Sequence, residues 1–212
     1  MKNQADKERK FWNSFAGKYD KFISKALGST YESLYKNLIG DVQNTDNVLE
    51  IGTGTGLIAF RISEYVKNIT ALDYSPEMIQ IAKKKQTGKQ NTTIHFETGD
   101  CYNLNFNEKT FDLVIASNIM HLLTEPEKAL SEIKRVMKLN GRVILPTFCH
   151  GDTTISRFLS GIFGLFGFRA YNKWSTGNFK KFIENNGFKI IRSEAIRSKI
   201  PLMYIIAEKH PV

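Results

Sequence analysis

Residues Val48–Gly56, VLEIGTGTG, form the stretch that decides the fold. An apolar run carries one acid, Glu50, and then gives way to Gly52, Gly54 and Gly56. The segment LIAFRISEYV follows at once. This order predicts a buried strand, a tight turn and a helix whose N-terminus faces the turn, because glycine adopts backbone angles that other residues resist. Such a turn lets a ligand approach the main chain closely, so we expect a nucleotide-like ligand there.

Acidic residues follow the next two expected strands. The strand expected at 69–73 ends in Asp73, at the spacing of an acid that binds the hydroxyl pair of a ribose. The strand expected at 93–98 is followed by Gly99 and Asp100. Because the carboxyl ends of parallel strands meet at one edge of a sheet, we expect both acids to face the same ligand.

Strands and helices alternate through the middle of the chain. We expect strands at 47–51, 69–73, 93–98, 111–116 and 142–148, with helices at 56–66, 76–86 and 126–138. Asn140-Gly141 is interpreted as the stop of the last of these helices. The alternation predicts an α/β fold with a doubly wound, mostly parallel sheet. The flanking elements are expected to be helices at 3–16, 29–41 and 176–186, and a terminal hairpin of strands at 188–195 and 201–208.

Four segments resemble, in order and spacing, the successive motifs of class I S-adenosylmethionine-dependent methyltransferases: LEIGTGTG, ALDYSPEMI, FETGDCYNLNF and FDLVIASNIMHLL. The resemblance is greatest to the small-molecule branch with the ubiquinone/menaquinone C-methyltransferases and phospholipid N-methyltransferases. Trp12 and Tyr19-Asp20 resemble the start of that branch. The resemblance implies a Rossmann-like, seven-stranded sheet with an antiparallel last strand. It also implies S-adenosyl-L-methionine as cofactor, S-adenosyl-L-homocysteine as its product, and a small, lipophilic or aromatic acceptor.

The resemblance also implies a role for each matching residue. Glu50 would orient the cofactor's amino group through water, Asp73 would bind the ribose hydroxyls, and Tyr19 would close over the cofactor. The other cofactor-binding residues would be Gly52, Thr53, Gly54 and Gly56 at the methionine part, Tyr74 and Met78 at the adenine, Asp100 and Cys101 at the adenine amino group, and Ser117 at the methionine end.

His121 is the histidine placed nearest the expected reacting end, just after Ser117-Asn118. Because the sulfonium methyl is already activated, its transfer depends mostly on positioning and desolvation. A base is needed only if the attacking group is protonated. We interpret His121 as a candidate catalytic base or acceptor-orienting residue, with local packing as the alternative.

Two alternatives to a methyltransferase stay open. Gly54, Gly56 and Ala59 satisfy the G-x-G-x-x-A pattern of NAD-dependent dehydrogenases, although the carboxylate of Glu50 would repel a pyrophosphate. The other alternative is a non-catalytic protein that binds S-adenosylmethionine or another adenosine ligand. No nucleic-acid substrate is expected, because Ala116–Ile119 stands where many base-methylating enzymes carry an Asn/Asp-Pro-Pro-Tyr motif.

Length and composition set the remaining expectations. A chain of 212 residues with 42% apolar content suits one globular domain. We divide it into an N-terminal helical lid (1–45), a cofactor-binding core (46–148), a cap after the fifth strand (149–175), and a C-terminal helix and hairpin (176–212). Cys101 and Cys149 form neither a metal-ligand set nor a disulfide framework. The start of the chain has no signal-peptide core, so a cytoplasmic location is expected.

The segment Phe158–Phe168 is the unusual part of the cap. It holds four phenylalanines, three glycines and no charge, and Arg157, Arg169 and Lys173 flank it. One interpretation is a helical cap over an acceptor site, and another is a helix packed on the sheet. With the formal charge of +9, peripheral contact with an anionic membrane is a third interpretation.

Overall fold

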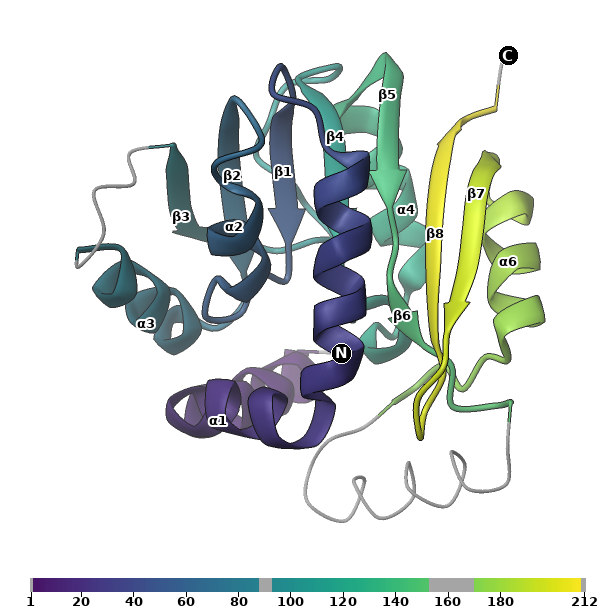
Figure 1. Cartoon of the computed structure of the whole chain (residues 1–212). Helices are drawn as coiled ribbons and strands as arrows, with labels where there is room; N and C mark the ends of the chain where they lie inside the picture. Colours follow the sequence, from purple (N-terminus) through teal and green to yellow (C-terminus); the bar gives the residue numbers. More distant parts are fainter. Residues whose placement is uncertain (1, 88–92, 153–169, 211–212) are drawn as a thin grey trace. The chain divides into compact units, whose positions relative to one another are not determined.

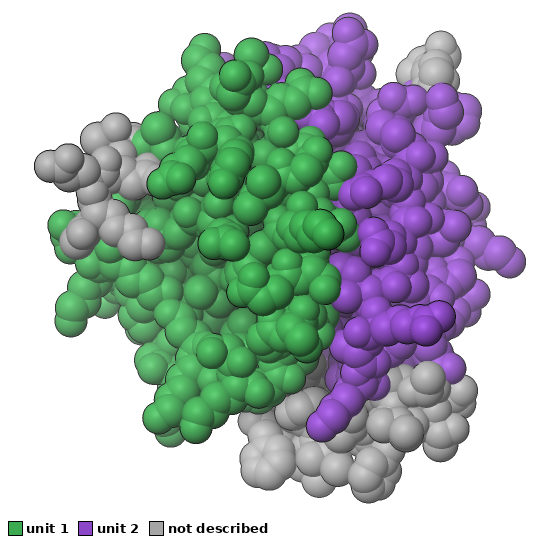
Figure 2. Space-filling view, viewed as in Figure 1, with its two compact units in different colours: residues 1–101 green, residues 102–212 purple. Residues whose placement is uncertain are grey.

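The computed structural model describes residues 2–87, 93–152 and 170–210. Figure 2 shows the two compact units of the chain, residues 1–101 (unit 1) and 102–212 (unit 2). The prediction of a single domain with boundaries at 45, 148 and 175 stays a prediction. Residues 158–168, expected in a helical cap, lie outside the described residues.

The described part of unit 1 contains a parallel set of strands: β1 (Asn47–Ile51), β2 (Asn68–Asp73) and β3 (Ile94–Thr98). β2 pairs with both of the others. The central strand positions are buried because apolar side chains occupy both faces, as expected for parallel strands. The carboxyl ends of β1, β2 and β3 therefore meet at one edge (Figure 1).

A single helix, α1 (Lys2–Asp41), replaces the two N-terminal helices that we expected. The interval between 16 and 29 contains Gly17 and Gly28 but no proline, so its backbone N–H groups can continue the helical hydrogen bonds. Buried Ala16 and Ile23 stabilise this interval by packing. Figure 1 shows that α1 changes direction along its length.

Two shorter helices complete unit 1. α2 (Leu57–Ile62) is shorter than the expected 56–66, and it begins at Gly56 in the left-handed region with φ of 83°. α3 (Pro76–Thr87) begins where predicted, with the Ser75 hydroxyl accepting from the Met78 N–H over 3.2 Å. Both α2 and α3 contact α1.

Unit 2 contains parallel strands β4 (Phe111–Ala116) and β5 (Met137–Ile144). β8 (Leu202–Lys209) is antiparallel to β5, which confirms the predicted antiparallel last strand, and β7 (Phe188–Ile196) forms the expected hairpin with β8. The described helices of this unit are η1 (Met120–Leu122), α4 (Pro126–Val136) and α6 (Thr176–Asn185), of which α6 contacts β7 and β8.

The expected boundary between α4 and β5 was wrong. The helix ends at Val136, and Asn140-Gly141 lies inside β5 rather than at a helix stop. The register of the pairing between β4 and β5 shifts at this point. A Cβ on Gly141 would meet the Lys138 carbonyl oxygen at 3.0 Å. Asn140-Gly141 therefore lies at an irregularity within a strand, which is another place where glycine is favoured.

β5 ends before the expected position 148. Pro146 lacks an N–H and interrupts the strand, which resumes as the short β6 (Thr147–Phe148). β6 pairs with the same neighbour, β8, as β5 does. β5 and β6 together thus occupy the place of the single fifth strand that we expected.

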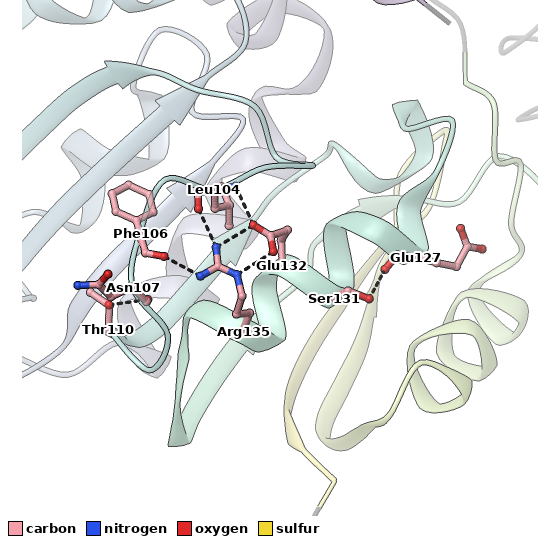
Figure 3. A network of polar contacts seen from close by, with 8 residues as sticks. All are labelled: Leu104, Phe106, Asn107, Thr110, Glu127, Ser131, Glu132 and Arg135. Carbon is pink, nitrogen blue, oxygen red and sulfur yellow. Dashed lines mark hydrogen bonds and ion pairs between the residues drawn. The ribbon is translucent and has the colours of Figure 1, made fainter.

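Arg135 near the end of α4 fixes the loop that precedes β4 (Figure 3). Its guanidinium donates to the carbonyl oxygens of Phe106 at 2.6 Å and Leu104 at 2.7 Å, and to both carboxylate oxygens of Glu132 at 2.8 Å. Glu132 in turn accepts from the Leu104 N–H at 2.8 Å. The hydrogen bonds from Arg135 lower the pKa of Glu132. The planar guanidinium group presents several N–H donors in fixed directions, so it can donate to several acceptors at once.

Candidate functional site

The glycine loop, residues 52–56, joins β1 to α2 in unit 1. Gly52, Gly54 and Gly56 have φ of 72°, 57° and 83°, in the region that favours glycine. A Cβ on Gly56 would lie only 2.8 Å from the Phe96 ring. The sequence therefore keeps glycine here for both its backbone angles and its small size.

This loop is hydrogen-bonded to the carboxyl end of β2. The Thr53 N–H donates to the Leu72 carbonyl oxygen at 2.8 Å. The Gly54 N–H donates to Asp73 Oδ2 at 2.8 Å, and the Ser75 N–H donates to Asp73 Oδ1 at 2.8 Å. The carboxylate also accepts from the Tyr74 N–H, and because its two oxygens offer about four lone pairs in all, it can still accept a further hydrogen bond from a hydroxyl group.

Burial governs the acidity of Asp73. Although the residue is partly exposed, desolvation raises the pKa of its carboxyl group to about 6, against the lowering effect of hydrogen bonds from Ser75 and Gly54. At neutral pH the group is mostly ionised and is therefore an acceptor. The arrangement matches the predicted ribose-binding role of Asp73, which stays a prediction.

Glu50 lies beneath the loop and is 2% exposed. The Thr53 hydroxyl donates to Glu50 Oε2 at 2.9 Å. Among the described residues, no lysine or arginine forms an ion pair with it. Desolvation is the largest of the effects that together raise the pKa of Glu50 to about 8, and the nearby Asp73 is another. A cationic group brought to Glu50 would stabilise its ionised form, which is the chemistry expected for a ligand's ammonium group.

Tyr19 of α1 lies over the loop. A Cβ on Gly54 would be 3.5 Å from Tyr19 Cε1 and 4.0 Å from the sulfur of Met78. The hydroxyl of Tyr19 is 3.5 Å from that of Tyr31, and burial raises the pKa of Tyr19 well above its ordinary value. The structure thus brings the predicted N-terminal residue against the predicted glycine turn.

The predicted adenine-side residues also lie in unit 1. Met78 is buried, whereas the Tyr74 ring is 39% exposed and lies under the guanidinium of Arg9. Burial raises the pKa of the Cys101 thiol to about 12, with further contributions from Asp100 and Asp73. The Gly99 N–H donates to the Asp73 carbonyl oxygen at 3.0 Å, so Asp100 and Cys101, after β3, lie near Asp73 at the end of β2.

Ser117 and His121 belong to unit 2, so their predicted roles beside the cofactor stay predictions. Both are buried, and His121 packs its ring at 5.2 Å from that of His150. Burial lowers the pKa of His121 well below its ordinary value and lowers that of His150 to about 4. Both imidazoles are therefore neutral at neutral pH.

The contacts between α1 and the loop include a set that the sequence did not predict. Thr55 Oγ1 donates to Asp20 Oδ1 at 2.5 Å. The ammonium group of Lys85 lies 2.5 Å from Asp20 Oδ2 and donates to the Thr55 carbonyl oxygen at 2.9 Å. Asp20 was visible as part of Tyr19-Asp20, whereas Lys85 stands in a lysine run at a helix end, where cations are favoured for the helix dipole alone.

Residues 49–145 match the family described as "Methyltransferase domain". The chain is 28% identical over 136 residues to the ubiquinone/menaquinone biosynthesis C-methyltransferase UbiE of Zymomonas mobilis, which covers 63% of this chain and 56% of that protein. It is 26% identical over 218 residues to the demethylmenaquinone methyltransferase of Thermotoga maritima, covering 93% of this chain and 92% of that protein. The chain thus spans little more than half of the first of these relatives.

The crystal structure of the YcgJ protein from Bacillus subtilis has a similar fold. The TM-score is 0.72 at 17% identity, covering 84% of this chain and 98% of that one. This likeness confirms the predicted α/β fold class. Within the described residues, no helix combines the length and apolarity needed to cross a bilayer.

Proposed function

We propose that this chain, whose residues 49–145 match a methyltransferase domain, is an S-adenosylmethionine-dependent methyltransferase that methylates a small aromatic acceptor. The observation that carries the proposal is the joint arrangement of Glu50, the glycine loop and Asp73 at the carboxyl ends of β1 and β2. A buried carboxyl group lies beneath the loop, and a second carboxylate is hydrogen-bonded to the Gly54 N–H at 2.8 Å.

The residues of unit 1 fit S-adenosylmethionine. Glu50 has no described ion pair and would interact with the amino group of the cofactor, directly or through water. Asp73 can accept a further hydrogen bond and would bind a ribose hydroxyl, and Met78 and Cys101 would contact the adenine. When bound, the cofactor supplies a methyl group activated by a sulfonium centre. The chain's own residues have to orient that group and exclude water.

An aromatic acceptor suits the partly exposed rings on α1. Neighbouring rings in this stripe have centroids between 5.2 and 6.4 Å apart, and the stripe consists of Phe11, Trp12, Phe15, Tyr19 and Phe22. Such rings offer faces and edges for an aromatic ligand. The two relatives named above take their names from ubiquinone and menaquinone biosynthesis, which supports a quinone-precursor acceptor.

His121 would take the acceptor's proton. A phenolic or enolic hydroxyl becomes a stronger nucleophile when it loses its proton, and a neutral imidazole can accept it. Burial keeps His121 in that neutral form, but it also makes the imidazole a weaker base because the charged form is desolvated, so an acceptor-orienting role fits the residue as well as proton transfer does. His121→Asn should therefore lower turnover while leaving S-adenosylhomocysteine affinity close to that of the unchanged chain.

The test is incubation of the full chain with methyl-labelled S-adenosylmethionine and a panel of phenols, hydroquinones and lipid amines. We expect label in a phenol or hydroquinone, and none with Asp73→Ala. Binding of S-adenosylhomocysteine without transfer to any member of the panel would favour the non-catalytic alternative. Transfer to lipid amines alone would contradict an aromatic acceptor. Sedimentation with anionic vesicles would separately test contact with a membrane.

A further inference from the structure

Three residues of unit 1 join α1 to the glycine loop and to α3. Asp20 comes from α1, Thr55 from the loop and Lys85 from the last turn of α3. One carboxylate oxygen of Asp20 accepts from the Thr55 hydroxyl at 2.5 Å, and the other lies 2.5 Å from the Lys85 ammonium group. Lys85 closes the triangle by donating to the Thr55 carbonyl oxygen at 2.9 Å. Every pair of the three is therefore in direct contact.

This triangle, named here the Asp20 clamp, lies beside Tyr19 in the sequence. The ring of Tyr19 faces Gly54, and Thr55 is the next residue along the loop. Fixing Asp20 to Thr55 therefore fixes the backbone of the neighbouring tyrosine against the neighbouring glycine. About two turns before Asp20 on α1, Asn13 Oδ1 accepts from the Ser75 hydroxyl at 2.6 Å, which ties the helix to the start of α3 as well.

We propose that Asp20, Thr55 and Lys85 are positioning residues that hold α1 over the glycine loop and so set how long the cofactor stays bound. The inference rests on the proposed function, since it needs a cofactor in the loop. None of the three residues has to touch the cofactor. They act through Tyr19, whose ring lies over Gly54 and would have to move for the methionine part of the cofactor to enter or leave.

The ion pair between Asp20 and Lys85 should change the dissociation rate of S-adenosylhomocysteine only moderately. The side chain of Asp20 is 41% exposed and that of Lys85 is 29% exposed, so water screens part of their attraction. We expect each clamp variant to release S-adenosylhomocysteine about three- to tenfold faster, the range set by losing one charged hydrogen bond.

The variants are Asp20→Asn, Thr55→Val and Lys85→Met in the full chain. Thr55→Ser keeps the hydroxyl and should retain the dissociation rate of the unchanged chain. Lys84→Met removes the neighbouring lysine, which is exposed, and serves as the matched control. The double variant Asp20→Asn with Lys85→Met should be less than additive, because both changes remove the same ion pair.

Two measurements separate this inference from the proposed function. Hydrogen exchange of α1, followed by mass spectrometry without any ligand, should rise in the clamp variants and stay unchanged in α6. Stopped-flow dissociation of S-adenosylhomocysteine should rise in the same variants. Unchanged exchange in α1 would overturn the clamp, and faster exchange with unchanged dissociation would overturn its role in cofactor release.

A failure of the unchanged chain to bind S-adenosylhomocysteine would have a different meaning. It would overturn the proposed function and, with it, the role of the clamp in cofactor release. The exchange measurement would still decide whether Asp20 holds the helix. Trp12, whose ring lies 6.3 Å from that of Tyr19, provides a fluorescence signal for the same movement in a Trp174→Phe background.

Discussion

The Gly54 N–H donates to Asp73 Oδ2 at 2.8 Å, which joins the glycine loop to the end of the neighbouring strand. The bond links two motifs that are 19 residues apart in the sequence. It leaves the carboxylate able to accept a further hydrogen bond and fixes the orientation of the carboxylate group. The loop and the acid therefore act as one site, and a change in either should alter the other.

Asp73→Asn should weaken S-adenosylhomocysteine binding about 10- to 100-fold, the loss expected for hydrogen bonds to a charged group. The amide keeps the shape of the side chain but loses the charge and one acceptor oxygen. Isothermal titration measures the change. Asp112→Asn is the matched control, because its carboxylate pairs with Lys138 at 2.8 Å in unit 2. Equal losses in both variants would contradict a specific role for Asp73.

Gly56→Ala should destabilise the fold by about 2 kcal/mol or more, through backbone strain and overpacking. The new Cβ would meet Phe96 at 2.8 Å, at a φ of 83°. Urea unfolding measures the loss. Gly177→Ala in the first turn of α6 is the control, since a Cβ there meets nothing within 4 Å. This control should gain about 0.4 to 1 kcal/mol.

Glu50 should make the chain less stable as pH rises. Its pKa is raised from 4.5 to about 8 in the folded protein, so the folded state binds more protons than the unfolded state between these values. The free energy of unfolding therefore falls across this range, by at most about 1.4 kcal/mol per pH unit for one group. Urea unfolding of Glu50→Gln at several pH values should show a flatter dependence than that of the unchanged chain.

Glu64→Gln, at an exposed position of unit 1, provides the control for that series. It should reproduce the slope of the unchanged chain. A ligand with an ammonium group prefers ionised Glu50, so S-adenosylhomocysteine should bind more tightly as pH rises towards about 8. An identical pH dependence of binding in Glu50→Gln would argue against contact between Glu50 and the amino group.

Arg135→Lys should lower the free energy of unfolding by about 1 kcal/mol, because an ammonium group cannot make the same set of hydrogen bonds. The guanidinium currently satisfies the carbonyl oxygens of Leu104 and Phe106 together with Glu132 (Figure 3). Chemical denaturation checks this. Lys128→Met, which breaks an exposed ion pair with Glu125, should change stability by less than about 0.5 kcal/mol.

Local signals predicted much of the fold. The bounds expected for β1 and β4 agree with the structure, since each is an apolar run between clear turns. A pattern that fits two structures gave a wrong boundary between α4 and β5: Asn140-Gly141 suits a helix stop and a strand irregularity equally well. The long α1 was missed because the interval with Gly17 and Gly28 is stabilised by tertiary packing, which a local pattern does not contain.

In the candidate site, too, some contacts follow from local sequence patterns and others depend on tertiary packing. Glu50, Gly54 and Asp73 could be placed together from the sequence, because parallel strands bring their carboxyl ends to one edge. The contact between Asp20 and Lys85 could not, because it depends on how a bent helix lies across α3. Residues of α1 carry no strand register that would fix their neighbours, so only the structure shows which of them reach the loop.

The most direct measurement of the central claim is isothermal titration of the full, unchanged chain with S-adenosylhomocysteine. We predict binding of one molecule per chain, accompanied by loss of that signal in Asp73→Ala at unchanged folding. The absence of binding at high micromolar ligand by a folded chain would contradict the assignment of the glycine loop, Glu50 and Asp73 as a cofactor site.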